Sequence, residues 1–280
     1  MNNFIKKITS QTSLSTQEAW WLLEHVTNKK KESLVLQNSL SQAEQSDIEK
    51  LILKIKNEHM PLAYILGFVP FLDLKIHVNP PILIPRQETE EWVQDLIEIL
   101  KKQSSKDFSI LDIGTGSGCI ALALAKALPG AHVTAIDINI LSIELARYNA
   151  KTNNISNVTF IQSDLFSSIP SGARFDLIVS NPPYIDPSMI NSISKQVKDW
   201  EDHRALFADN QGMAIIDKIL QQSHDFLYSR ADMPFQLVLE IDQYHKDGAL
   251  SCAQNYDWSA TARKDSFGNW RTLWCTKNIL

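Results

Sequence analysis

The sequence predicts an α/β protein, with a doubly wound and mostly parallel sheet preceded by a small helical bundle and a β-hairpin. Three observations support this fold class. From residue 109 onwards, apolar runs of strand length alternate with helical patterns. A glycine-rich turn, Gly114-Thr115-Gly116-Ser117-Gly118, joins the first of these strands to a helix. Before residue 60, apolar residues recur at helical rather than strand spacing.

Length and composition limit the class of protein. A chain of 280 residues has room for one large domain and a small one, and its net charge of −5 argues against a nucleic-acid groove as its main surface. Cys119, Cys252 and Cys275 are far apart, as is usual in a reducing cytoplasm, and neither they nor the histidines have metal-ligand spacing. No apolar run reaches membrane-spanning length, and the first residues lack the core of a signal peptide. We therefore expect a soluble, cytoplasmic protein without a metal.

Residues 1–60 are predicted to form a helical domain. Ser15-Thr16-Gln17-Glu18 fits a capping box at the start of one helix, and Ser46-Asp47-Ile48-Glu49 fits a second. The adjacent Trp20 and Trp21 indicate either core positions, which we favour, or a partner-binding surface. After the second capping box, the apolar residues that share one helical face are Ile48, Leu51, Ile52 and Ile55.

Residues 61–84 are predicted to form a hairpin linker to a larger domain over residues 85–280. Alternation of apolar and polar residues over 72–78 predicts a strand, which Asn79-Pro80-Pro81 ends. A helix is expected from about Thr89 to Lys102. Arg86, just before this helix, either steers an anionic group or forms a surface salt bridge.

The first two strands of the sheet predict a nucleoside site. Ser109–Ile113 is the first strand, and it runs through the Gly114–Gly118 turn into a helix over 119–125. The second strand, Ala131–Ile136, ends at Asp137, about 20 residues past the glycines, where a carboxylate accepts hydrogen bonds from ribose hydroxyls. The G-x-G-x-G spacing differs from that of dinucleotide enzymes, so the turn need not hold a pyrophosphate.

The third strand adds a second candidate contact to the nucleoside. A helix over 141–151 leads to the strand Val158–Ile161, which is followed by Asp164 and Leu165. At this position an acidic side chain accepts from an adenine amino group while an apolar one covers the ring. The alternative for Asp164 is a turn or helix cap.

The fourth strand, Phe175–Ser180, ends in Asn181-Pro182-Pro183-Tyr184, and the two prolines place Asn181 at the carboxyl end of the sheet. A planar NH2 group is a poor nucleophile because its lone pair is delocalised. The Asn181 side-chain carbonyl and the Pro182 backbone carbonyl can accept its two N–H bonds and favour bond formation to a carbon electrophile. Tyr184 could stack on the planar group or face a cationic methyl donor. A strand followed by a Pro-Pro turn is the structural alternative.

The remaining elements complete the alternating pattern. Residues 185–210 are expected to be a loop-rich insertion beside the substrate, followed by a helix over 211–226. Pro234–Ile241 is predicted to be the fifth strand. The end of the chain is predicted to be a hairpin of 260–263 and 270–276, with residues 265–269 as its turn.

Four stretches together resemble the peptide chain release factor N(5)-glutamine methyltransferases over nearly the whole chain. They are Pro61-Leu62-Ala63-Tyr64-Ile65-Leu66-Gly67, Ile84-Pro85-Arg86 with Thr89-Glu90, Asp112 to Gly118, and Asn181-Pro182-Pro183-Tyr184-Ile185. The chain departs from the family pattern at Gln87, at Asp202 after Glu201, and at Asp242 after Glu240-Ile241.

The resemblance implies a seven-stranded, Rossmann-like methyltransferase domain that uses S-adenosylmethionine and releases S-adenosylhomocysteine. The acceptor would be the glutamine amide of the Gly-Gly-Gln motif of class-1 release factors, docked with help from the helical domain. Gly114, Thr115, Gly116, Ser117 and Gly118 would hold the methionine part, Asp137 the ribose, and Asp164 and Leu165 the adenine. Asn181 would lie beside the cofactor and, with Pro182, grip the glutamine, in a pocket that Pro183 and Tyr184 complete.

Three alternatives remain at this point. The same tetrapeptide would serve a methyltransferase acting on an exocyclic amine of DNA or RNA. A nucleoside-binding protein without turnover and a nicotinamide dehydrogenase are the others. We expect a monomeric enzyme whose partner is a release factor and which binds neither a membrane nor, directly, a nucleic acid.

Overall fold

The computed structural model describes residues 1–37, 39–103, 107–229 and 233–278. They form two compact units, Met1–Phe68 with Ile193–Trp200, and Val69–Ser192 with Glu201–Leu280. Each unit has its own core and is considered by itself.

The first unit is helical because its apolar residues lie on one face of each helix. Its core includes Ile5, Ile8, Leu22, Ile48 and Ile52. Trp20 is buried, as favoured, whereas Trp21 is 43% exposed. Its helices are α1 (Asn2–Gln11), α2 (Thr16–Thr27), α3 (Lys31–Leu36), α4 (Gln42–Asn57), α5 (Leu62–Leu66) and α9 (Lys195–Trp200).

One predicted helix start is confirmed and one is wrong. The Ser15 side chain accepts from the Glu18 N–H, and Glu18 accepts from the Ser15 N–H, as predicted. The second capping box belongs to Ser41 and Glu44, so Ser46 lies inside α4. Both serines precede a glutamate by three residues, and the pattern could not show that α4 already begins at Gln42.

Helix α9 is tied to the rest of the first unit through Trp200. The Trp200 indole N–H donates to the Glu58 carbonyl over 2.7 Å. Its ring lies 6.5 Å from that of Tyr64, between centroids. Helix α9 lies in the segment 185–210, which was expected to be a loop-rich insertion and which contains short helices.

A β-hairpin is present within residues 61–84, but its strands span only residues 68–77, because Leu62–Leu66 form helix α5. Strands β1 (Phe68–Phe71) and β2 (Leu74–His77) pair in a two-stranded sheet. Leu72, predicted to lie in the strand, is in the turn with a φ of 50°. Leu72 fits the alternating sequence pattern, but the strand itself begins only at Leu74.

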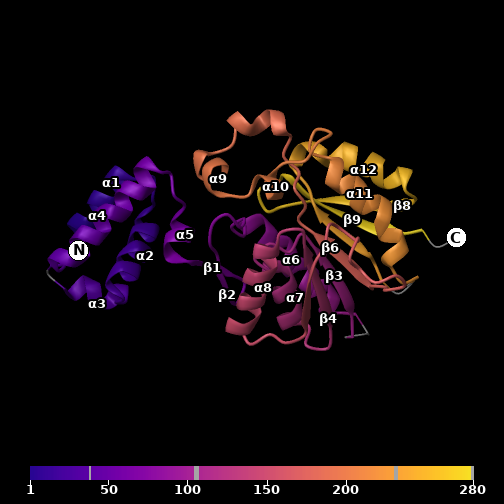
Figure 1. Cartoon of the computed structure of the whole chain (residues 1–280), viewed down its shortest axis with the longest axis horizontal. Helices are drawn as coiled ribbons and strands as arrows, with labels where there is room; N and C mark the ends of the chain where they lie inside the picture. Colours follow the sequence, from indigo (N-terminus) through magenta and orange to yellow (C-terminus); the bar gives the residue numbers. More distant parts are fainter. Residues whose placement is uncertain (38, 104–106, 230–232, 279–280) are drawn as a thin grey trace. The chain divides into compact units, whose positions relative to one another are not determined.

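The second unit is a seven-stranded sheet covered by helices on both faces (Figure 1). The strand order is β5-β4-β3-β6-β7-β9-β8, and β9 is antiparallel to both of its neighbours. The strands are β3 (Ser109–Ile113), β4 (His132–Asp137), β5 (Val158–Gln162), β6 (Leu177–Ser180), β7 (Leu237–Glu240), β8 (Trp258–Lys264) and β9 (Trp270–Lys277). The predicted fold class, strand positions and final hairpin are confirmed.

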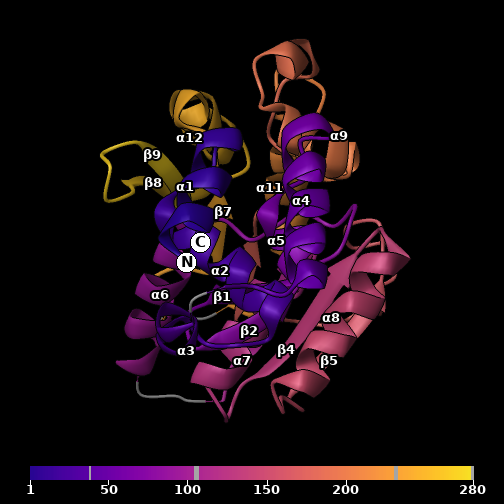
Figure 2. The same ribbon diagram turned by 90° about the vertical axis from the view of Figure 1, so that its left-hand side faces the viewer.

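The helices of this unit lie in two layers. Figure 1 shows α6 (Gln87–Lys101), α7 (Cys119–Ala127) and α8 (Ile140–Thr152) on one face and α11 (Ala214–Ser223) and α12 (Lys246–Asn255) on the other. Helix α8 lies along β4 and β5 (Figure 2). The remaining short helices are η1 (Pro187–Asn191), α10 (His203–Leu206), η2 (His224–Phe226) and η3 (Gln243–His245). The sequence patterns did not identify α12, whose ten residues include a glycine and few large apolar side chains.

Both layers are held by burial of the strand side chains. Ile216 and Ile219 of α11 pack with Leu111 and Ile113 of β3 in one core cluster. At the other face, α6 buries Trp92, Val93 and Leu96. The strand order reverses between β3 and β6, and open sheets of this kind bind ligands at the carboxyl ends of the strands at such a point.

Two departures from the family pattern have a local explanation. The Asp202 side chain accepts from the Arg204 N–H and caps α10. The Asp242 side chain accepts from the Tyr244 N–H and caps η3. At both positions the aspartate side chain thus satisfies a donor at the start of a helix.

Within the described ranges, no helix combines the length and apolar character that crossing a membrane requires. Over the same ranges, no group of three or more His, Cys, Asp and Glu side chains is arranged to hold a metal ion.

Candidate active site

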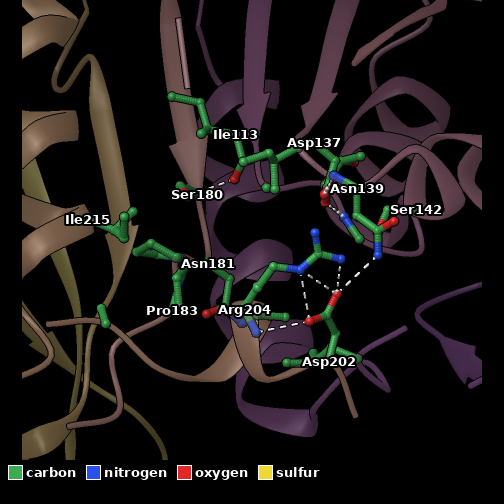
Figure 3. A pocket seen from close by; sticks show the side chains of 18 of the residues that line it. Ile113, Asp137, Asn139, Ser142, Ser180, Asn181, Pro183, Asp202, Arg204 and Ile215 are labelled. Atoms are coloured by element: carbon green, nitrogen blue, oxygen red, sulfur yellow. Dashed lines mark hydrogen bonds and ion pairs between the residues drawn. The ribbon is translucent and has the colours of Figure 1, made fainter. Parts of the chain in front are cut away.

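A cavity of about 440 Å³ opens at the carboxyl ends of β3, β4, β5 and β6. This volume is within the range of small-molecule sites. Figure 3 shows Asp137, Asn139 and Ser142 on one side and Asn181 and Pro183 on another. The residues predicted for the site that line the cavity are Gly114, Thr115, Gly116, Ser117, Asp137, Asp164, Leu165, Asn181, Pro182 and Pro183. Gly118 and Tyr184 are not among its lining residues.

Most N–H groups of the glycine-rich turn are bonded within the chain, and the turn contributes space to the cavity. The Gly114 and Thr115 N–H groups donate to the Ile136 carbonyl, and the Gly116 N–H donates to Asp137 Oδ2 over 2.9 Å. Gly114 and Gly116 have positive φ angles of 71° and 55°, which glycine adopts without strain. A Cβ at Gly116 would have no neighbour within 4 Å, so the turn leaves the cavity open.

Gly118 faces the neighbouring helix. A Cβ at this position would lie 2.9 Å from the Ala146 Cβ, closer than two carbon atoms pack. Its φ is 85°, and it precedes the first residue of α7. The structure therefore explains this glycine by the close approach of α7 and α8.

Asp137 is fixed at the tip of β4 by backbone donors. Oδ1 accepts from the Asn139 N–H over 2.8 Å, and Oδ2 accepts from Gly116. Burial raises the pKa of Asp137, and these two hydrogen bonds oppose the rise. Each carboxylate oxygen has a second lone pair, so both can still accept from a ligand hydroxyl in the cavity.

Asp164 and Leu165 form the turn after β5. The Asp164 carbonyl accepts from the Ser167 N–H over 3.1 Å, and the Asp164 residue is exposed at the cavity wall. Leu165 has a φ of 45° and packs against the core cluster of the second unit. The two residues thus place one polar and one apolar side chain at the same end of the cavity.

Asn181 lies between the glycine-rich turn and α6. Its backbone carbonyl oxygen would be 4.0 Å from a Cβ at Gly114, which shows how closely β3 and β6 approach here. Its side-chain Nδ2 donates to Thr89 Oγ1 over 3.1 Å. Pro182, directly after it, is buried, and Pro183 is half-buried.

Tyr184 points to a buried carboxylate. Its hydroxyl donates to Glu240 Oε1 over 3.2 Å. Burial and the Glu240 charge raise the pKa of Tyr184 far above its usual range, so the hydroxyl stays protonated. The Tyr184 ring packs against the core cluster of the sheet.

The sequence patterns missed two residues that hold these groups in place. Glu240, at the end of β7 and 1% exposed, accepts from Thr89 and Trp92 of α6. Asn139 caps α8 and donates from Nδ2 to Asp202 Oδ2 over 3.1 Å. A carboxylate at the end of an apolar strand, as in Leu237–Glu240, is the signal by which Glu240 could have been found.

One ion pair lines the cavity, and a second involves Arg86. Arg204 binds Asp202 over 2.7 Å, and both line the cavity (Figure 3). Arg86 donates to Glu201 Oε1 over 2.7 Å, and Glu201 is 4% exposed. The salt-bridge interpretation of Arg86 is therefore confirmed, with a buried rather than an exposed partner.

The arrangement combines two kinds of site in one cavity. Asp137 and the glycine-rich turn suit a nucleoside with a small charged tail. Asn181 and Pro182 add carbonyl acceptors for a planar NH2 group. Transfer of a group from a nucleoside ligand to an amide or amine nitrogen is the chemistry that this combination allows.

Two family models match the chain. One, for the methyltransferase small domain, matches residues 87–197. The other, for the PrmC N-terminal domain, matches residues 5–67. The first model matches part of the second unit, and the other matches most of the first unit.

Curated relatives agree with these models. The release factor glutamine methyltransferase of Flavobacterium psychrophilum is 40% identical over 228 residues, which cover 80% of this chain and 78% of that protein. That of Francisella tularensis is 45% identical over 179 residues, covering 64% of this chain and 61% of that protein.

A solved structure shows the same fold. The ribosomal protein L11 methylase of Lactobacillus delbrueckii subsp. bulgaricus has a TM-score of 0.52 at 22% identity, covering 73% of this chain and 86% of that chain. The 40% identity to the Flavobacterium psychrophilum protein, over 78% of its length, establishes the family. The chain belongs to the release factor glutamine methyltransferase family.

Proposed function

We propose that this protein transfers a methyl group from S-adenosylmethionine to the side-chain amide of the glutamine in the Gly-Gly-Gln motif of class-1 peptide chain release factors. The observation behind the proposal is that Asn181 and Pro182 line the same cavity as Asp137 and the glycine-rich turn. Membership of the family supplies the acceptor, since the relatives are named release factor glutamine methyltransferases.

The residues of the cavity fit the cofactor. Gly114 and Gly116 leave the backbone uncovered, which suits the methionine part. Asp137 would accept from the ribose hydroxyls, and Asp164 and Leu165 would border the adenine. When bound, S-adenosylmethionine supplies an electrophilic methyl group on a sulfonium.

Asn181 and Pro182 would hold the acceptor nitrogen. The Asn181 Oδ1 and the Pro182 carbonyl oxygen each accept one N–H bond of the glutamine amide, which fixes the direction of its lone pair. The same two oxygens stabilise the positive charge that develops on nitrogen. No strong general base is needed before attack, because the methylated nitrogen is acidic enough to lose its proton afterwards.

The first unit is the proposed docking domain for the release factor. It matches the PrmC N-terminal domain model over residues 5–67. Trp21, at 43% exposure, is a candidate contact, because exposed tryptophans contribute strongly to interfaces. We propose that the protein acts as a monomer in the cytoplasm.

An in vitro transfer experiment tests the function. The full chain is incubated with labelled S-adenosylmethionine and, in separate reactions, with a class-1 release factor, the same factor with alanine in place of the motif glutamine, DNA, and RNA. Mass spectrometry should find one added methyl group on the motif peptide of the unaltered factor alone. Label in DNA or RNA but not in the factor would instead support the exocyclic-amine alternative.

A further inference from the structure

The hydrogen bonds around Glu240 have a defined direction. Glu240 Oε2 accepts from the Trp92 indole N–H over 2.8 Å and lies 2.7 Å from Thr89 Oγ1. As a carboxylate, Glu240 has only lone pairs to offer, and an indole N–H is only a donor. The Thr89 hydroxyl therefore donates its single proton to Oε2.

The direction of the Thr89 hydrogen bond determines which atom of the Asn181 amide can face Thr89. With its proton given to Glu240, the Thr89 oxygen has only lone pairs to offer, and Asn181 Nδ2 lies 3.1 Å away. If the Asn181 amide were turned over, its carbonyl oxygen would face the Thr89 lone pairs with no proton between them. Two acceptors that face each other without a proton are unfavourable, so the turned amide is disfavoured.

We infer that Glu240 and Thr89 are positioning residues that lock the Asn181 amide with its NH2 toward α6 and its carbonyl oxygen toward the acceptor nitrogen. Thr89, Asn181 and Pro182 line the cavity, so the locked amide stands where the proposed substrate is bound. Neither positioning residue acts on the substrate itself. This inference rests on the proposed function, which requires an acceptor at Asn181 and not a donor.

Thr89 offers a matched pair of variants. Thr89→Val removes the hydroxyl at nearly constant volume, whereas Thr89→Ser keeps it. Without the hydroxyl the amide is free to turn, so Thr89→Val should lower kcat by roughly 10- to 100-fold, the size expected for a misplaced catalytic group. The dissociation constant of S-adenosylhomocysteine, measured by calorimetry, should stay within about twofold. The direction of the Asn181 amide does not change the contacts that bind this cofactor product. Thr89→Ser should restore most of the lost kcat.

A double-mutant cycle separates positioning from a structural role. If Thr89 acts only through Asn181, Thr89→Val should lower the residual rate of Asn181→Ala by less than about twofold. A Thr89→Val loss of full size in the Asn181→Ala background would overturn the inference, as would wild-type kcat in Thr89→Val itself. Glu240→Gln, which can keep its amide oxygen toward Trp92, should lose less activity than Thr89→Val.

A readout without turnover keeps the inference apart from the proposed function. The Asn181 side-chain amide resonances are identified by NMR as those absent from Asn181→Ala. They should shift in Thr89→Val and stay near their wild-type positions in Thr89→Ser. If the wild type methylates no release factor, the proposed function fails, but these spectra still decide whether Thr89 holds the amide. Unchanged spectra in Thr89→Val would overturn the inference.

Discussion

At the scale of the residue, the orientation of the Asn181 side chain depends on the atoms around it. Its amide nitrogen is bound by Thr89, and its backbone follows the buried strand β6 into two prolines. A side chain held in this way has lost most of its freedom before any ligand arrives. Preorganised polar groups of this kind account for large rate effects because they do not reorganise during the reaction.

Replacing Asn181 with alanine tests its part in the chemistry. We expect methyl transfer to fall by roughly a hundredfold or more, the size of losing one preorganised polar contact, while S-adenosylhomocysteine binds almost as before. Single-turnover rates with labelled cofactor and calorimetry measure the two effects. Asn255→Ala, at an exposed position in α12, is the control and should behave as wild type. Full activity in Asn181→Ala would remove this residue from the chemistry.

Asp112 lies beneath the glycine-rich turn and is fully buried. Burial raises its pKa to about 7, although the Thr115 hydroxyl, which donates to it over 2.7 Å, opposes the rise. In the unfolded chain the carboxyl ionises near the ordinary aspartate pKa of 3.8. The folded state therefore holds an extra proton between about pH 4 and 7.

The sign of this difference predicts how stability depends on pH. The stabilisation that Asp112 adds to the free energy of unfolding is fully present below its unfolded pKa. It is lost as the pH rises to about 7, at up to about 1.4 kcal/mol per pH unit. Asp112→Asn should lose this decline, so its free energy of unfolding relative to wild type should rise from pH 4 to 7. Urea unfolding at several pH values measures the difference. If the free energies of unfolding of the two proteins changed in parallel with pH, Asp112 would not be the source of the decline.

At the scale of the element, α4 shows why a local motif does not fix a helix start. Ser41 and Ser46 are each followed three residues later by a glutamate. Only Ser41 has the extended backbone of a cap, with φ −63° and ψ 159°, and it makes both hydrogen bonds of the box. Residues 42–45 add a further turn to the helix, whose Ile48 and Ile52 are buried in the core.

These two serines form a matched pair for a stability measurement. Ser41→Ala removes the cap and should lower the free energy of unfolding by about 1 kcal/mol. Ser46→Ala lies at an exposed position inside the helix and should be neutral or slightly stabilising, because alanine has the higher helix propensity. Urea unfolding of the full chain, followed by circular dichroism, measures both. Equal effects of the two substitutions would contradict the observed start of α4.

At the scale of the whole molecule, four strand ends converge on one cavity. β3, β4, β5 and β6 are parallel, so their carboxyl ends lie along the same edge of the sheet. The residues that follow each strand, from Gly114 to Pro183, line the cavity there. A ligand seated in it would contact segments from four different strands and stabilise the unit as a whole.

Thermal unfolding with ligand measures this stabilisation. S-adenosylhomocysteine at 100 times its dissociation constant should stabilise the protein by about 2.7 kcal/mol, which corresponds to roughly 5–10 °C in Tm for a unit of this size. Asn181→Ala should keep the shift, whereas Asp137→Asn should reduce it. NAD at the same concentration should give no comparable shift. A larger shift with NAD would favour the dehydrogenase alternative.

The sequence by itself determined the fold class, the main strands of the sheet, and ten residues that line one cavity. It did so because alternation, glycine turns and strand-ending prolines are local signals, and the parallel order of the strands brings their ends together. It did not find α12, the start of α4, or the packing role of Gly118. Only the tertiary structure decided that Thr89 and Glu240, 92 and 59 residues from Asn181, fix the direction of its amide. Such a hydrogen-bonded chain joins a helix to two strand ends, and no periodicity or spacing in the sequence encodes a contact of that kind.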